Sequence, residues 1–172
     1  FNAWNGEETL FEKFARRLNL AVKEADMEMA IHGVALPDTL WGTFRAFQPA
    51  QEVVFVLLFD QFEEFFTYPL DQQLNFKNQL AELLYADYPH FLEQHESSLS
   101  ADQIAYLSDR LEVRTLFAIR ADRMHELDRL SDRLFAILSN RIELRALPRA
   151  EAEKAIVLPA GLPESEGFAG SP

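Results

Sequence analysis

The sequence has 172 residues, of which 48% are hydrophobic and 26% are charged, values typical of one globular domain and not of a disordered chain. Its 16 basic and 28 acidic side chains give a net charge of −12, which disfavours partners that are nucleic acids or anionic membranes. The absence of cysteine excludes disulfides, thiol nucleophiles and thiolate metal sites. No apolar run reaches the roughly 20 residues of a membrane-spanning helix, and we expect a cytoplasmic protein.

Both ends of the sequence favour a fragment of a longer protein. The first residue is Phe1 instead of methionine. Residues 159–172 contain three glycines and three prolines, a composition typical of a linker. We therefore expect one partial domain over residues 1–158, followed by a linker to a missing downstream domain.

The first fifty residues predict two helices. Asn5 is a suitable N-cap, and Leu10, Phe14 and Leu18 follow at the spacing of a buried helical face, so we expect a helix to about residue 29. A second, short helix is expected to begin after Asp38 and to end before Pro49.

Residues 53–59 form an unbroken run of β-branched, aliphatic and aromatic side chains. A continuous run of this length is typical of a strand buried on both faces, and such strands occur mainly in parallel sheets flanked by helices. Asp60 follows directly, so we expect it at the carboxyl end of a central strand, where open α/β sheets bind ligands.

The rest of the chain predicts further helices and two more strands. Residues 91–100 are interpreted as a polar excursion, and residues 141–147 alternate with the period of an edge strand. The expected strands are residues 113–119 and 141–147, and the expected helices are residues 70–86, 101–109, 123–130, 132–138 and 150–158.

Two strand ends carry residues suited to nucleotide chemistry. Neighbouring parallel strands lie about 4.8 Å apart, so Asp60 and Arg120 are expected at one edge of the sheet. A carboxylate after a buried strand is suited to bind Mg²⁺, and an acidic residue a few positions later can activate water, which favours Glu64 and leaves Glu63 as the alternative. Arg120 could reach a terminal phosphate, with Asp122 orienting the guanidinium.

Simpler interpretations of these residues stay open. Acidic residues such as Glu63 and Glu64 also favour the first turn of any helix, because they complement its dipole. All eight cations between residues 111 and 149 are arginines, which suits bidentate pairing with phosphates but also ion pairing on helix surfaces. The four histidines have no paired metal-ligand spacing, and no serine nucleophile motif is present.

The sequence contains no Gly-x-x-x-x-Gly-Lys-Ser/Thr phosphate-binding loop. None of its four lysines follows a glycine. We therefore do not expect this chain to hydrolyse ATP by itself.

Residues 53–67, VVFVLLFDQFEEFFT, resemble the Walker B segment of the novel STAND class of signal-transducing P-loop NTPases, whose usual form is an apolar strand followed by Asp-Gln-Phe-Glu-Glu-Leu-Phe-Thr. Phe65 replaces the usual leucine, a packing difference. Further stretches are similar to the family in its order: residues 1–4 to the end of its second strand, residues 120–122 to its sensor-one arginine motif, residues 147–156 with 159–160 to the helix after its last strand, and residues 167–169 to its exit segment.

The resemblance implies a three-layer P-loop NTPase-like core, with a mainly parallel sheet flanked by helices and with its N-terminal part missing. It implies ATP or ADP and Mg²⁺ as cofactors, with Asp60 binding the metal, Glu64 or Glu63 activating water, and Arg120 sensing the terminal phosphate. Implied partners are a fused effector, a repeat-type sensor and further copies, in signalling or defence. The missing first strand would be the middle of the sheet, and its loss would expose apolar edges.

Two other functions remain as alternatives. The first is a catalytically inactive α/β interaction or scaffold module that keeps the fold without nucleotide chemistry. The second is a helical adaptor, which predicts no parallel sheet.

Overall fold

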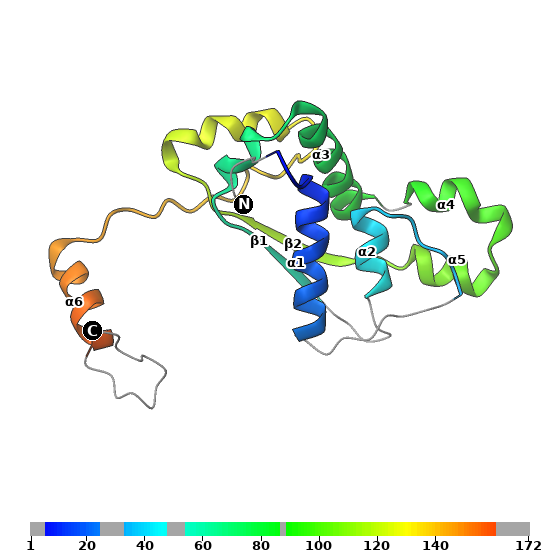
Figure 1. Ribbon diagram of the computed structural model, residues 1–172, viewed down its shortest axis with the longest axis horizontal. Helices are drawn as coiled ribbons and strands as arrows, with labels where there is room; N and C mark the ends of the chain where they lie inside the picture. The colour runs from blue at the N-terminus through cyan, green and yellow to red at the C-terminus, as the bar shows by residue number, and fades with distance from the viewer. Residues whose placement is uncertain (1–5, 25–32, 48–53, 87–88, 161–172) are drawn as a thin grey trace. The chain divides into compact units, whose positions relative to one another are not determined.

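Figure 1 shows the computed structural model, which describes residues 6–24, 33–47, 54–86 and 89–160. It consists of two units, residues 1–140 and residues 141–172. The elements in chain order are α1 (Leu10–Glu24), α2 (Leu40–Ala46), β1 (Val54–Phe59), the 3-10 helix η1 (Phe62–Thr67), α3 (Leu70–Tyr85), α4 (His90–His95), the 3-10 helix η2 (Glu96–Ser98), α5 (Ala101–Ser108), β2 (Glu112–Phe117), the 3-10 helix η3 (Ala121–Leu130) and α6 (Arg149–Ala160).

The sheet of the first unit is a parallel pair of β1 and β2, as Figure 1 shows. Its register runs from Val54 opposite Glu112 to Phe59 opposite Phe117. Parallel strands need a crossover connection, and η1, α3, α4, η2 and α5 supply it. The prediction of an α/β fold with a parallel sheet is confirmed at this level, and the helical adaptor is excluded.

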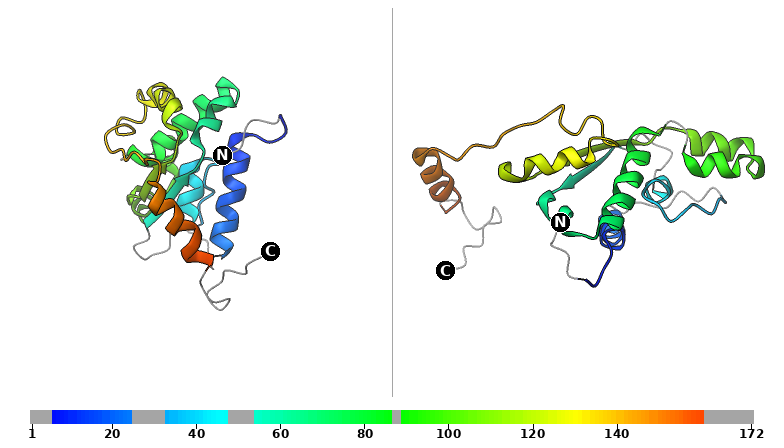
Figure 2. Two further views of the ribbon diagram at one scale, coloured as in Figure 1. Left: turned by 90° about the vertical axis from the view of Figure 1, so that its left-hand side faces the viewer. Right: turned by 90° about the horizontal axis from the view of Figure 1, so that it is seen from above.

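Helices α1, α2 and α3 cover one face of the strand pair. The α1 residue Phe14 lies with its ring centroid 6.2 Å from that of Phe59, 6.1 Å from that of Phe44 in α2 and 6.0 Å from that of Phe76 in α3. Phe44 also meets Phe55 of β1 edge to face at 4.9 Å. These aromatic contacts place the hydrophobic core between the three helices and this face of the sheet. Figure 2 shows the helices and strands from two further sides.

The prediction that β1 is buried on both faces is wrong for this chain. Phe55 and Phe59 are buried, whereas Val54, Val56 and Leu58 are 47%, 60% and 69% exposed. The alternation arises because the helices that contact the strand pack on the Phe55 and Phe59 side, while successive side chains of a strand point to opposite faces. An apolar run identifies the strand, but it does not reveal which faces the chain's own helices cover.

Two helix starts differ from the prediction or add to it. Thr9 and Glu12 bond reciprocally at the start of α1, since the Thr9 amide donates to Glu12 Oε2 at 2.8 Å and the Glu12 amide to Thr9 Oγ1 at 3.2 Å. The expected cap Asn5 lies outside the described residues. Thr39, and not Asp38, caps α2 by accepting from the Gly42 amide at 3.1 Å. A Thr-x-x-Glu signature could have located the first of these caps.

Further boundaries are corrected in the first unit. The expected polar excursion over 91–100 contains α4 and η2, so most of it is helical. Residues 132–138, expected as a helix, form successive turns instead. The expected helix over 123–130 is the 3-10 helix η3, which begins two residues earlier.

The described part of the second unit contains α6, which extends two residues beyond the predicted end at 158. The predicted strand over 141–147 is wrong, because these residues have no regular secondary structure, and Ile142 and Leu144 are 88% and 92% exposed. A strand requires a neighbour that bonds to its backbone, and within the described ranges the paired strands are β1 and β2. Residues 159 and 160 of the predicted linker belong to α6, and the rest of it, residues 161–172, lies outside the described residues.

Candidate functional site

The carboxyl ends of β1 and β2 meet at one edge of the sheet. Asp60 directly follows β1, and Arg120 follows β2 after two further residues. Backbone hydrogen bonds continue past the strands: the Ala118 amide donates to the Phe59 carbonyl at 2.8 Å, and the Phe62 amide to the Ala118 carbonyl at 2.9 Å. This edge therefore brings together Asp60 and Arg120, which are 60 residues apart in the sequence.

Asp60 lies in a tight turn between β1 and η1. Its Oδ1 accepts a hydrogen bond from the Gln61 amide at 2.9 Å, and its side chain is exposed. Gln61 has φ of +51°, the left-handed region that non-glycine residues seldom adopt. This residue turns the chain from the strand into η1 within one position.

Glu63 and Glu64 are adjacent in the first turn of η1, but their surroundings differ. Glu63 is 9% exposed, and its Oε2 accepts from the Arg120 amide at 3.4 Å. Glu64 is half-buried. Complementing the dipole of η1 remains an explanation for the presence of both acidic residues.

Arg120 and Asp122 form a bidentate ion pair at the start of η3. Arg120 Nε lies 3.1 Å from Asp122 Oδ1, and Nη2 lies 2.9 Å from Oδ2. The two side chains are 66% and 61% exposed, so the pair is a surface pair that fixes a guanidinium orientation. The sequence predicted this partner for Arg120.

Arg123 forms a second bidentate pair one turn away, with Glu126 at 2.9 Å for both hydrogen bonds. These hydrogen bonds raise the pKa of Arg123, and the charges of Glu126, Asp122 and Glu63 add to the effect. Two of the eight arginines between 111 and 149 therefore pair with nearby carboxylates on a 3-10 helix, as the surface-pairing interpretation expects.

A cluster of phenylalanines lies beneath this polar edge. The ring of Phe117 stacks on Phe59 at 5.0 Å and meets Phe62 edge to face at 4.7 Å, and Phe62 stacks on Phe65 at 5.0 Å. Phe59, Phe62 and Phe65 are buried. Interlocked buried aromatics have few alternative packings, so they hold the turn with Asp60 and the start of η3 in a fixed relation.

The residues at this edge fit a Mg²⁺ site that has a single protein carboxylate as its ligand. Within the described ranges no group of three or more His, Asp or Glu side chains has the arrangement of a metal cage. Mg²⁺ is commonly bound by only one or two carboxylates together with water and substrate phosphates. The exposed carboxylate of Asp60 suits that type of site.

Sequence reasoning missed two buried cations. Lys77 of α3 is 8% exposed and donates to both carboxylate oxygens of Asp132 at 3.0 Å. Arg45 of α2 is 1% exposed, its Nη2 donates to the Asp109 carbonyl, and its guanidinium lies 5.3 Å from the Tyr106 ring centroid. Burial lowers the pKa of Arg45. No local pattern marks either residue, because both contacts join distant parts of the sequence.

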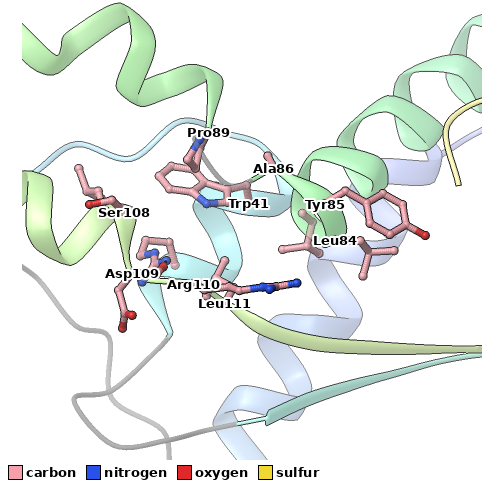
Figure 3. Close-up of a pocket in the computed structure, with 12 residues that line it drawn as sticks. Trp41, Leu84, Tyr85, Ala86, Pro89, Ser108, Asp109, Arg110 and Leu111 are labelled. Carbon is pink, nitrogen blue, oxygen red and sulfur yellow. The ribbon is translucent and has the colours of Figure 1, made fainter. Parts of the chain in front are cut away.

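Arg45 also lines a cavity of about 160 Å³ at the opposite end of the sheet from Asp60 and Arg120. The cavity lies between α2, the last turns of α3 and α5, and the residues that lead into β2; Figure 3 shows Trp41, Arg110 and Leu111 among its lining residues. None of the five residues predicted from the sequence lines it. The cavity and the charged edge are separate features.

No protein-family model, curated protein or solved structure matches this chain. None of the helices in the described ranges combines the length and the apolar composition that crossing a bilayer requires.

Proposed function

We propose that this chain is the Walker B and sensor-one part of an ATP-binding and ATP-hydrolysing STAND switch in a multidomain signalling or defence protein. One observation carries the proposal: β1 and β2 pair in parallel, so Asp60 and Arg120 follow neighbouring strands at the same edge. The sequence motif from Asp60 to Glu64 supports it independently of the geometry.

Each residue at the edge has a distinct role in this proposal. Asp60 holds Mg²⁺, which when bound neutralises phosphate charge. Glu64 orients the attacking water and accepts its proton, and Arg120 contacts the terminal phosphate. Asp122 holds the Arg120 guanidinium through the bidentate pair. The phosphates themselves require a Gly-Lys-Ser/Thr loop, which this sequence does not contain.

The test is a Glu64→Gln variant of the natural full-length protein, measured for Mg·ATP binding and for phosphate release. Gln keeps the size of the side chain but cannot accept the proton, so we expect binding to persist while turnover falls about 100-fold or more. Glu96→Gln is the matched control, because Glu96 is exposed in η2, outside this edge of the sheet. Unchanged turnover in Glu64→Gln would refute the role of Glu64.

A second candidate function is an interaction module without nucleotide chemistry. The observation that favours it is the uncovered apolar face of the sheet, where Val56, Leu58 and Leu116 are 60%, 69% and 59% exposed. The measurements of Mg·ATP binding and phosphate release on the unmodified full-length protein separate the two candidates. A protein that neither binds nor hydrolyses Mg·ATP would favour the interaction module.

A further inference from the structure

The two adjacent glutamates of η1 differ in what their carboxylates can do. A 3-10 helix has three residues per turn, so neighbouring side chains point about 120° apart. Glu63 points inward and is 9% exposed, while Glu64 is half-buried at the surface of the same turn. A group that activates water must meet water and substrate, and the inward position of Glu63 suits a different task.

Glu63 bonds to the backbone of the residue that carries the guanidinium. Its Oε2 accepts from the Arg120 amide at 3.4 Å, and Arg120 is the N-cap residue of η3. At 3.4 Å the contact is longer than the usual range of about 2.7–3.2 Å for an N–H···O hydrogen bond, so it is a weak one.

This contact follows two backbone hydrogen bonds that join the two strand ends. The Ala118 amide bonds to the Phe59 carbonyl, the Phe62 amide bonds to the Ala118 carbonyl, and the Arg120 amide bonds to the Glu63 carboxylate. The first two are backbone contacts that any sequence could make. Among these contacts the third depends on a side chain, so residue 63 contributes to the attachment of η3 to η1.

We propose that Glu63 is a positioning residue that places Arg120 relative to Asp60 and Glu64, and that Glu64 alone activates water. This inference rests on the proposed function, and it gives Glu63 a role of its own, where the sequence favoured Glu64 as the base and left Glu63 as the alternative. It predicts that position 63 needs a hydrogen-bond acceptor but not a base, whereas position 64 needs a base.

Gln and Met substitutions at position 63 form a matched pair. The carboxamide oxygen of Gln still accepts from the Arg120 amide, whereas Met has a similar length, suits a buried site and lacks a strong acceptor. In the 172-residue chain we expect hydrogen exchange of the Arg120 amide to become about fivefold to tenfold faster in Glu63→Met and to stay close to wild type in Glu63→Gln. Equal exchange in wild type and Glu63→Met would overturn the contact.

Turnover in the natural full-length protein supplies the second readout. We expect Glu63→Gln to retain turnover, Glu63→Met to lower kcat with little change in KM for Mg·ATP, and Glu64→Gln to lose turnover. A Glu63→Gln variant that binds Mg·ATP but does not hydrolyse it would make Glu63 the base and would overturn the proposal. Amide exchange needs no nucleotide, so the contact is decided even if the protein proves not to be an ATPase.

Discussion

The two ends of the parallel strand pair both hold an arginine, and the two arginines are placed in opposite ways. At the amino end, Arg45 is 1% exposed and is surrounded by Trp41, Tyr106 and the loop before β2. At the carboxyl end, the Arg120 side chain is 66% exposed and pairs along its own segment with Asp122. Arg45 contacts several elements of the fold, whereas the Arg120 side chain lies at the surface, above the cluster of buried phenylalanines.

The difference in burial suggests that Arg45 serves the stability of the fold and Arg120 does not. A buried guanidinium is costly to desolvate, so it persists where aromatic faces and carbonyl groups compensate it. An exposed ion pair contributes little to folding, so the Arg120 pair can be changed without loss of the fold, which is compatible with the role proposed for it. The amino end of the strand pair therefore contributes to the stability of the fold, and the carboxyl end holds the candidate site.

The largest expected effect in this comparison is on stability. Arg45→Ala removes a buried side chain and its contacts with Tyr106 and Trp41, so we expect a loss of about 3 kcal/mol in the free energy of unfolding. Arg120→Ala is the matched control and should change it by no more than about 0.5 kcal/mol. Urea unfolding of both variants measures the difference. Equal losses would contradict the assignment of the two ends.

The smallest expected effect is a pH dependence in the ion pair between α3 and the turns after η3. Hydrogen bonds from Lys77 lower the pKa of Asp132 from its ordinary value of 3.8. A carboxyl group with a lowered pKa stabilises the fold above its unfolded pKa, and this contribution disappears as pH falls through the folded pKa. Asp132→Asn should therefore be slightly less stable than wild type at pH 7 and equal to it at strongly acidic pH. A difference that is independent of pH would exclude the ion pair as its source.

The sequence predicted the local features of the molecule better than the relations between distant parts. The apolar run before Asp60 identified β1, and the spacing of leucines identified α3 to within a residue. The uncovered face of β1 was missed, because burial depends on which helices pack against the strand. The strand predicted over 141–147 was wrong for a related reason, since alternation alone supplies no bonded neighbour.

The candidate site divides in the same way. Asp60, Glu64 and the pair of Arg120 with Asp122 follow from residue types at strand ends. The contact between Glu63 and the Arg120 amide could not be predicted, because it requires the register of two strands and the turn at Gln61. The left-handed conformation of Gln61 leaves no signal in the sequence, where glycine or asparagine would have been the usual indication.

The central claim is that β1 and β2 are direct neighbours, so that Asp60, Glu63 and Arg120 lie at one edge of the sheet. The most direct measurement is disulfide formation by Val56→Cys with Arg114→Cys, which are opposite each other in the register, in a natural sequence that has no cysteine within these 172 residues. Leu58→Cys with Glu112→Cys is the control, displaced by four residues, or about 13 Å along the strands.

Direct pairing predicts that the first pair forms an intramolecular disulfide and that the control pair does not, both in this chain and in the natural full-length protein. Another strand between β1 and β2 would separate the first pair by about 10 Å, beyond the reach of a disulfide. Failure of the first pair to oxidise in the full-length protein would contradict the account, because the Glu63 carboxylate and the Arg120 amide could not then be in contact.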